Sequence, residues 1–255
     1  MIANYHTHTF RCGHAVGADR DYVEAALARG LKTLGFSDHI PMPFPDGRDD
    51  AFRVPRRLLK DYVNSVLALK EEYAGRIEIL LGFEAEYYPD LFEAMMAQLR
   101  PYPIDYLLLA MHFNDSGEDH YNPRPRRDEP WLIQYVDRAL EGLDTGCYSC
   151  FAHPDLPYFT GPEKIYRREM RRLCLGAKER DIPLEINALG LYEGKCYPSP
   201  VFWEIASELG CRCVIGCDAH APQDVADPEQ LRAAQAFAAR FGLVPEQKLT
   251  IRRPF

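Results

Sequence analysis

Short apolar runs alternate with helical patterns along nearly all of the 255 residues of this chain. Such alternation is the signature of βα repeats, in which consecutive strands lie parallel in one sheet. The pattern predicts strands over residues 2–5, 34–37, 77–83, 106–111, 147–152, 183–186 and 211–216, with residues 249–251 as a candidate eighth strand. The chain is therefore expected to fold as a parallel α/β barrel.

The intervals between these strands show the 3.6-residue periodicity of amphipathic helices. Helices are expected over residues 19–29, 131–140, 164–178, 201–209 and 228–240. A further helix is expected to run from the end of a long loop to about residue 73. The long loop, residues 41–55, is rich in proline, aspartate and arginine. A chain of this length suits one α/β barrel, for which about 250 residues is typical. Because no flexible linker divides it, we expect a single domain over residues 1–255.

Charge and hydropathy exclude several classes of protein. The formal net charge of −8 argues against a nucleic-acid surface, which needs clustered lysine and arginine. No apolar run reaches the roughly 18 residues of a membrane span. The N-terminal residues show no export-signal pattern, so we expect a cytoplasmic protein whose eight cysteines are reduced thiols.

Seven of the eight histidines lie at the ends of the expected strands or just beyond them, together with one glutamate and one aspartate. These residues are His6, His8, His14, His39, Glu84, His112, His153, Asp218 and His220. In a parallel barrel the carboxyl ends of the strands meet on one rim, where the active site forms. Imidazole and carboxylate are the ligands that first-row divalent cations prefer. Nine ligands are too many for one ion, so the sequence predicts two or three.

A close pair of divalent ions can hold a hydroxide between them and clamp the oxygens of an in-line displacement at phosphorus. Hydrolysis of a phosphate ester is therefore the expected reaction. Hydrolysis of an amide or a lactone is the competing reading of the same ligand set.

Eight short motifs resemble those of the polymerase and histidinol phosphatase (PHP) family, in the order in which that family carries them. They are His6-Thr7-His8, Cys12-Gly13-His14-Ala15, and the segments of residues 35–41, 82–86, 111–113, 151–155, 184–187 and 216–222. The segments around residues 12–15, 38–41 and 184–187 most resemble the members that hydrolyse histidinol phosphate. The resemblance implies a distorted (β/α)7 TIM-like barrel with a trinuclear centre of zinc, iron or manganese.

The resemblance also implies a role for each predicted ligand. His6, His8, Glu84 and Asp218 would hold the first ion, and Glu84 would bridge to a second ion held by His112 and His153. His14, His39 and His220 would hold the third. Glu84 is preferred to Glu86 because it directly follows Gly82-Phe83, as the bridging carboxylate of the family does. Asp218, His220 and Glu84 are the expected catalytic residues, and His120, which the motifs leave out, is expected in a surface loop.

The substrate contacts are less specified by the motifs. The family often has an arginine or lysine after the glycine that corresponds to Gly190, whereas this chain has Leu191 and Tyr192, with Lys195 slightly later. An arginine-rich loop after the fourth strand can supply phosphate contacts instead, or be a solvated basic loop. The candidate substrate-binding residues are Arg124, Arg126, Arg127, Asn187 and Lys195. Acidic and aromatic residues of the loop 41–55 are candidates for covering the rest of the substrate.

The resemblance implies hydrolysis of L-histidinol phosphate to L-histidinol and phosphate in histidine biosynthesis, with a metal-bridging hydroxide as nucleophile. A phosphatase for another small phosphomonoester, such as a sugar or nucleotide phosphate, is the alternative. A nuclease is disfavoured by the acidic charge, and an amidohydrolase by the lack of a lysine at the end of a middle strand. A catalytically inactive barrel is disfavoured because every predicted ligand position carries a residue able to bind metal. The expected partner is a small molecule, not nucleic acid or membrane.

Overall fold

The computed structural model describes residues 1–117 and 121–255, so His120 lies outside the described residues. Its strands pair in chain order and every pair is parallel. The strands are β1 (Ala3–Asn4), β2 (Thr33–Phe36), β3 (Glu78–Ala85), β4 (Tyr106–Leu109), β5 (Cys150–Phe151), β6 (Leu184–Asn187) and β7 (Cys213–Gly216). The prediction of a seven-stranded parallel α/β barrel is confirmed.

The barrel closes through the segments that follow its first and last strands. Thr7 forms a parallel bridge with Ala219. The backbone N–H of His8 donates to the Ala219 carbonyl at 2.9 Å, and the Ala219 N–H donates to the carbonyl of His6 at 3.2 Å. This closure brings the first histidine pair of the sequence beside Asp218 and His220, more than 200 residues later.

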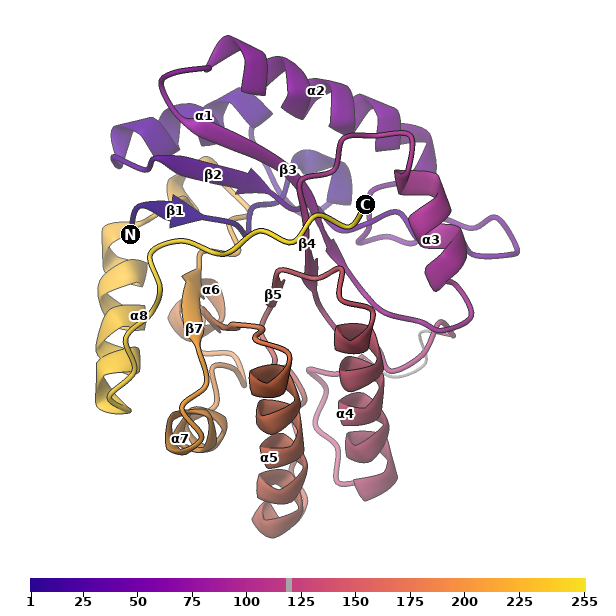
Figure 1. The fold of residues 1–255 in the computed structure, drawn as a ribbon, viewed down its shortest axis with the longest axis vertical. Coiled ribbons are helices and arrows are strands. Elements are labelled where there is room, and N and C mark those ends of the chain that lie inside the picture. Colours follow the sequence, from indigo (N-terminus) through magenta and orange to yellow (C-terminus); the bar gives the residue numbers. More distant parts are fainter. Residues whose placement is uncertain (118–120) are drawn as a thin grey trace.

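Helices surround the strands (Figure 1). They are α1 (Asp19–Ala28), α2 (Leu59–Glu72), α3 (Phe92–Leu99), α4 (Glu129–Asp144), α5 (Glu163–Glu179), α6 (Ala188–Tyr192), α7 (Pro200–Glu208) and α8 (Pro228–Arg240), with short 3-10 turns at Phe10–Cys12, Arg56–Leu58 and Pro222–Asp224. The start of α8 shows why the boundaries fall where they do: the Asp227 side chain accepts from the N–H groups of Glu229 and Gln230, and Pro228 takes the first position. Helices α3 and α6 were not predicted from the sequence. Within the described ranges, no helix has the length and hydrophobicity needed to span a membrane.

The prediction of an eighth strand at residues 249–251 is wrong. The segment after α8 crosses the barrel (Figure 1), and Leu249 packs in the interior cluster that contains Tyr5 and Tyr106. The N–H of Leu249 donates to the Tyr5 hydroxyl at 3.2 Å, and the N–H of Arg252 donates to the Ser149 hydroxyl at 2.9 Å. Residues 249–251 thus bond to side chains and form no strand. The segment pairs with the sheet earlier, where Glu246 forms a parallel bridge with Val214 of β7.

Candidate metal centre

A cavity of about 580 Å³ opens at the carboxyl ends of the strands. Seven of the nine predicted metal ligands line it: His14, His39, Glu84, His112, His153, Asp218 and His220. His6 and His8, the other two, are buried beside Glu84 and Asp218. The structure therefore brings all nine predicted ligands together at one end of the barrel.

Glu84 lies at the centre of this group, near the end of β3, and its two oxygens face two sets of histidines. Oε1 is 2.7 Å from Nε2 of His153 and 3.5 Å from Nε2 of His112. Oε2 is 3.5 Å from the Nε2 atoms of both His6 and His8. One carboxylate thus connects the two sets, the geometry that a bridging metal ligand needs. Glu86, two residues further along, does not contact His6 or His8 in any described interaction.

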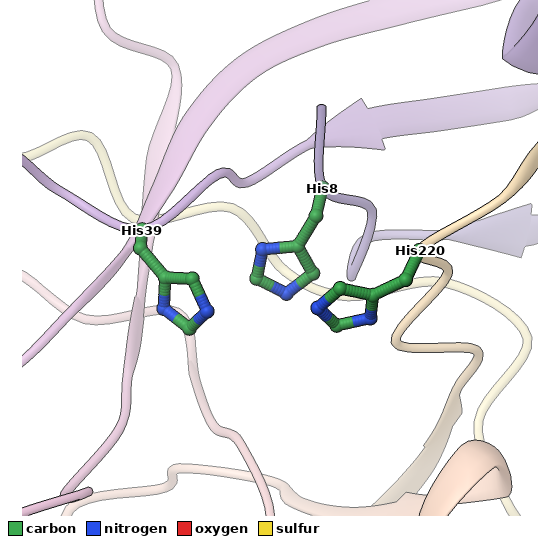
Figure 2. A group of neighbouring side chains, drawn as sticks. All are labelled: His8, His39 and His220. Carbon is green, nitrogen blue, oxygen red and sulfur yellow. The ribbon is translucent and has the colours of Figure 1, made fainter. Parts of the chain in front are cut away.

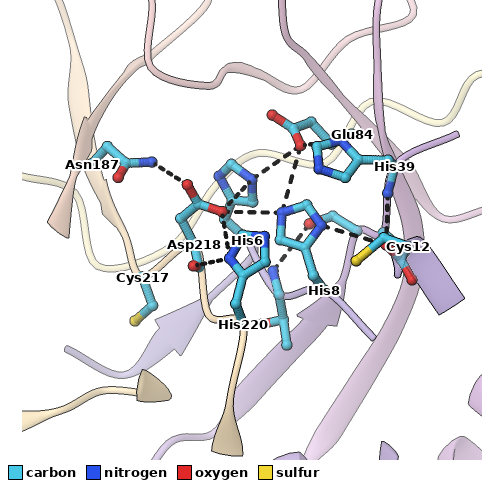
Figure 3. Close-up of polar contacts among 12 residues, drawn as sticks. His6, His8, Cys12, His39, Glu84, Asn187, Cys217, Asp218 and His220 are labelled. Carbon is cyan, nitrogen blue, oxygen red and sulfur yellow. Dashed lines mark hydrogen bonds and ion pairs between the residues drawn. The ribbon is translucent and has the colours of Figure 1, made fainter. Parts of the chain in front are cut away.

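Asp218 lies opposite Glu84, after β7 (Figure 3). Its Oδ1 is 3.0 Å from Nε2 of His8 and 3.3 Å from Nε2 of His6. Its Oδ2 accepts a hydrogen bond from the Asn187 amide at 3.1 Å. The Asn187 carbonyl oxygen is also engaged, since it caps α6 by accepting from the Gly190 N–H at 2.7 Å. Asn187, a predicted substrate contact, therefore holds Asp218 in place and is not among the residues that line the cavity.

A second group of histidines lies around His8, with His39 on one side of its ring and His220 on the other (Figure 2). The ring of His8 stacks at 4.2 Å on that of His220 and lies 4.3 Å from that of His39, and one nitrogen of each falls within 4.8 Å of the others. His14 lies further out, on the exposed rim, with its ring 4.8 Å from that of His220. The predicted trio of His14, His39 and His220 is thus contiguous, with His8 behind it.

Several polar atoms of the centre are buried without a hydrogen-bond partner among the described residues. They are Nε2 of His6, Nδ1 and Nε2 of His8, Nδ1 of His153 and Oε2 of Glu84. Four of these five atoms face a carboxylate or an imidazole within 3.5 Å without forming a well-aligned hydrogen bond. A buried polar atom whose hydrogen bond is not made costs about 1–3 kcal/mol, so the cluster is better satisfied by a bound ion than by its own contacts. Imidazole nitrogen and carboxylate oxygen are suited to divalent cations. This donor set fits metal ions.

Three of the histidines have a buried carboxylate behind the ring. Nδ1 of His6 lies 2.7 Å from Glu185, Nδ1 of His112 lies 3.2 Å from Glu86, and Nδ1 of His8 lies 3.4 Å from Asp38. A carboxylate at Nδ1 fixes the ring and leaves Nε2 to bind metal. This role was not predicted from the sequence, although each carboxylate stands in or beside a metal-ligand motif.

The same charges shift the pKa values of the centre. Burial opposes ionisation of Glu84, but its interactions with His39, His112 and His6 hold its pKa well below the ordinary value. Burial also opposes protonation of His8, but the neighbouring carboxylates of Asp218 and Asp38 raise its pKa to about 9. The pKa values of His6 and His153 are also raised, against burial, by carboxylates that include Glu185 and Glu84 respectively.

The outer histidines behave in the opposite way. Burial and the charge of His8 lower the pKa of His220 to about 3, and the pKa values of His14 and His39 are also lowered, chiefly by burial. In the metal-free protein the inner histidines His6, His8 and His153 are thus shifted toward the protonated form, whereas the outer trio is shifted toward the neutral form with a free lone pair.

Two of the predicted ligands have left-handed backbone conformations. φ is +30° at His153 and +52° at Asp218. Such conformations cost on the order of 1–3 kcal/mol in non-glycine residues and cluster at functional sites. At both positions the chain turns sharply at the end of a strand and directs the side chain into the centre.

The predicted substrate contacts separate in the structure. Arg124 and Lys195 line the cavity. Arg126 instead lies with its guanidinium 5.7 Å from the ring of Trp131, and Arg127 is exposed outside the cavity lining. The Lys195 ammonium lies 2.9 Å from Glu193.

Aromatic side chains complete the cavity wall: Phe52, Phe113, Tyr121 and Tyr197. Phe52, from the loop 41–55, lies 5.7 Å from Phe113, which lies 5.4 Å from Tyr121. The acidic residues of that loop bind arginines and do not line the cavity; Asp46 pairs with Arg48 at 2.9 Å.

Comparison with known proteins agrees with this geometry. The PHP domain model matches residues 4–189. A protein of Deinococcus radiodurans named probable histidinol-phosphatase is 31% identical over 242 residues, with 88% of each chain covered. The histidinol-phosphatase of Bacillus subtilis is 25% identical over 254 residues, which cover 86% of this chain and 94% of that protein.

Solved structures show the same fold. The histidinol phosphate phosphatase of Lactococcus lactis, in complex with zinc, L-histidinol and phosphate, superposes with a TM-score of 0.73 at 19% identity, covering 95% of this chain and 94% of that one. With the motif order, the barrel and the matches over most of the sequence in agreement, the chain belongs to the PHP family.

Proposed function

We propose that this protein hydrolyses L-histidinol phosphate to L-histidinol and phosphate. The observation that carries the proposal is a single cavity in which a histidine and carboxylate centre, two cationic side chains and an aromatic wall face one another. The proteins of Deinococcus radiodurans and Bacillus subtilis that share its sequence support this choice of substrate, because both are named histidinol-phosphatases.

The nine predicted ligands would hold two or three divalent ions of zinc, iron or manganese. One group consists of His6, His8 and Asp218, which lie around Glu84. His112 and His153 form a second group. The third group consists of His14, His39 and His220. Ions bound there would neutralise the phosphate oxygens and lower the pKa of a water nucleophile.

The residues of the chain provide orientation and proton transfer. Arg124 and Lys195 neutralise the phosphate oxygens that point away from the centre. Asp218 accepts the proton of the attacking water at Oδ1, while the Asn187 amide holds Oδ2. His220, with Nδ1 2.9 Å from the Asp218 carbonyl oxygen, presents its other nitrogen to the cavity. Phe52, Phe113 and Tyr121 flank the leaving alcohol and exclude water from its ring.

We also propose that residues 1–255 act as one catalytic domain. The family model ends at residue 189, but β7 and the two ligands after it lie beyond that point. Asp218 and His220 contact His8 directly, so the segment after residue 189 is needed to complete the centre.

A phosphatase for another small phosphomonoester is the second candidate, because the metal centre alone recognises phosphate. The aromatic wall favours a flat leaving group over a sugar. Phosphate release from a panel of monoesters, measured on protein of known metal content, tests this. A preference of about two orders of magnitude in kcat/KM for histidinol phosphate, close to 3 kcal/mol, supports the proposal. Similar weak rates on all esters would leave a phosphatase with a different substrate.

A further inference from the structure

The loop of residues 41–55 is linked to the metal centre by a buried ion pair, in addition to the hydrogen bond from the Val54 N–H to the His39 carbonyl at 3.2 Å. Arg53, whose side chain is 2% exposed, donates from Nε to Oε2 of Glu86 at 2.8 Å, and its Nη2 lies 2.7 Å from the same oxygen. The other oxygen of Glu86, Oε1, lies 3.2 Å from Nδ1 of His112. A single carboxylate thus contacts the loop with one oxygen and a predicted metal ligand with the other.

The Arg53 end of this link fixes the part of the loop that lines the cavity. Its guanidinium pairs with Asp50 and lies 4.3 Å from the ring of Phe52. Asp50 also accepts from the backbone N–H groups of Phe52 at 3.2 Å and Arg53 at 2.9 Å. The ring of Phe52 in turn lies 5.9 Å from that of His112. Arg53 therefore contacts both Asp50 and Phe52 of the loop, and Glu86 binds its guanidinium.

We propose that Glu86 and Arg53 are positioning residues that couple the order of the loop 41–55 to metal binding at His112. A carboxylate at Nδ1 of a ligand histidine orients the ring and raises its basicity, and loss of such a partner costs 10- to 100-fold in metal affinity. Coupling between two sites is reciprocal. A metal ion that fixes His112 must therefore also hold Glu86, Arg53 and the cavity-lining part of the loop.

The hydrogen-bonding groups of Glu86 and Arg53 determine which substitutions test the proposal. In Glu86→Gln the side-chain amide has only one oxygen that can accept a hydrogen bond. Both His112 and Arg53 donate to this position, so one of them would face the NH₂ group, which is also a donor. In Arg53→Lys the charge remains but the two-pronged contact to Glu86 is lost. Glu169→Gln is the matched control, because Glu169 is also buried and paired with two arginines, on α5, with no contact to the centre.

Two quantities are measured on the full chain: zinc affinity by competition with a chelator, and hydrogen exchange of the peptide covering residues 41–55 with and without zinc. In the wild type, zinc slows exchange in the loop. In Glu86→Gln, zinc affinity falls about 10- to 100-fold, and the slowing by zinc is lost. Arg53→Lys loses the slowing while keeping more of the zinc affinity. Glu169→Gln lowers the thermal midpoint and leaves both quantities unchanged.

The inference rests on the proposed metal centre, and the experiment separates the two. A wild type that binds no zinc, iron or manganese overturns both. A wild type that binds metal, with exchange in the loop indifferent to metal or with wild-type affinity in Glu86→Gln, overturns the coupling alone. If Glu86→Gln does not fold, Arg53→Lys decides: retained slowing by zinc in that variant overturns the proposal.

Discussion

The carboxylate of Glu185 occupies the space that a side chain at Gly216 would need, since a Cβ built on Gly216 would lie 1.7 Å from Oε1 of Glu185. That oxygen contacts Nδ1 of His6 at 2.7 Å, and the second oxygen accepts from the His153 N–H at 2.9 Å. Glycine in β7 thus allows a buried glutamate to support two predicted metal ligands.

Gly216→Ala is expected to displace Glu185 and release His6. Loss of such a support lowers metal affinity about 10- to 100-fold, so protein passed through a desalting column should retain less metal than the wild type. Gly142→Ala on α4 is the control, because its new methyl group crowds Tyr87 at 2.9 Å, with no metal ligand among its nearest contacts. Equal metal retention in the two variants would show that Glu185 does not support the centre.

Arg124 and Arg127 differ in position, and their substitutions should differ in effect. Arg124→Ala removes a charge from the cavity and is expected to raise KM for the phosphomonoester about 10- to 150-fold, since a hydrogen bond to a charged group contributes about 1.5–3 kcal/mol. Arg127→Ala, in the same loop but outside the cavity lining, should leave KM unchanged. Steady-state kinetics on metal-loaded protein test the pair. A larger rise in KM for Arg127→Ala would place the phosphate site further along the loop.

The sequence was sufficient to predict the barrel because each strand is a short, apolar run and each ligand motif follows one. β3 is longer than predicted because Gly82 and Phe83 are followed by the polar Glu84, which ends the apolar run but not the strand. The helix α3 was missed because its Met-rich sequence, Phe92–Leu99, is too short and too apolar to show a clear periodicity. Residues 249–251 have strand-like composition for a different reason, which is that Leu249 packs in the interior cluster that contains Tyr5 and Tyr106.

The predicted ligands could be found from sequence because metal-binding residue types stand at strand ends. The supporting roles of Glu185 and Glu86 could not, because they depend on contacts across 179 and 26 residues of sequence. The difference in position between Arg124, which lines the cavity, and Arg127, which does not, could not be predicted either, because it depends on the path of the loop. Residue type identifies candidate ligands, but three-dimensional contacts assign the residues that hold them.

Metal-free protein should lose stability as the pH rises from 6.5 to about 9. The folded-state pKa of His8 is raised from 6.5 to about 9, so its contribution is fully present below pH 6.5 and disappears as the pH passes through the folded value. His6 and His153 are shifted in the same direction. His220 and His39 have lowered pKa values. They are neutral in the folded and unfolded states well above pH 6.5, so they do not make the free energy of unfolding depend on pH there.

Metal loading should remove this loss, because ions bind neutral imidazoles in the folded state and replace the protons. Urea unfolding of chelated and metal-loaded protein across this range measures both trends. The loaded protein is expected to keep or gain stability as the pH rises. A metal-free protein whose free energy of unfolding rises between pH 6.5 and pH 9 would contradict the assignment of protons to the inner histidines.

His153 and His14 are both predicted ligands, but burial predicts that their loss has unequal consequences. His153 is 2% exposed and lies 2.7 Å from Glu84, so His153→Ala removes a ligand and leaves a buried carboxylate less compensated. We expect that variant to lose bound metal and on the order of 10²- to 10³-fold in kcat, the cost of removing one electrostatic group from a preorganised site. His14→Ala, at the exposed rim, should retain the metal of the inner groups and lose less activity.

Metal analysis and kinetics on the two variants test this, with circular dichroism to confirm the fold. Equal loss of metal in both would mean that the centre assembles as one unit and that the rim histidine is as necessary as the buried one.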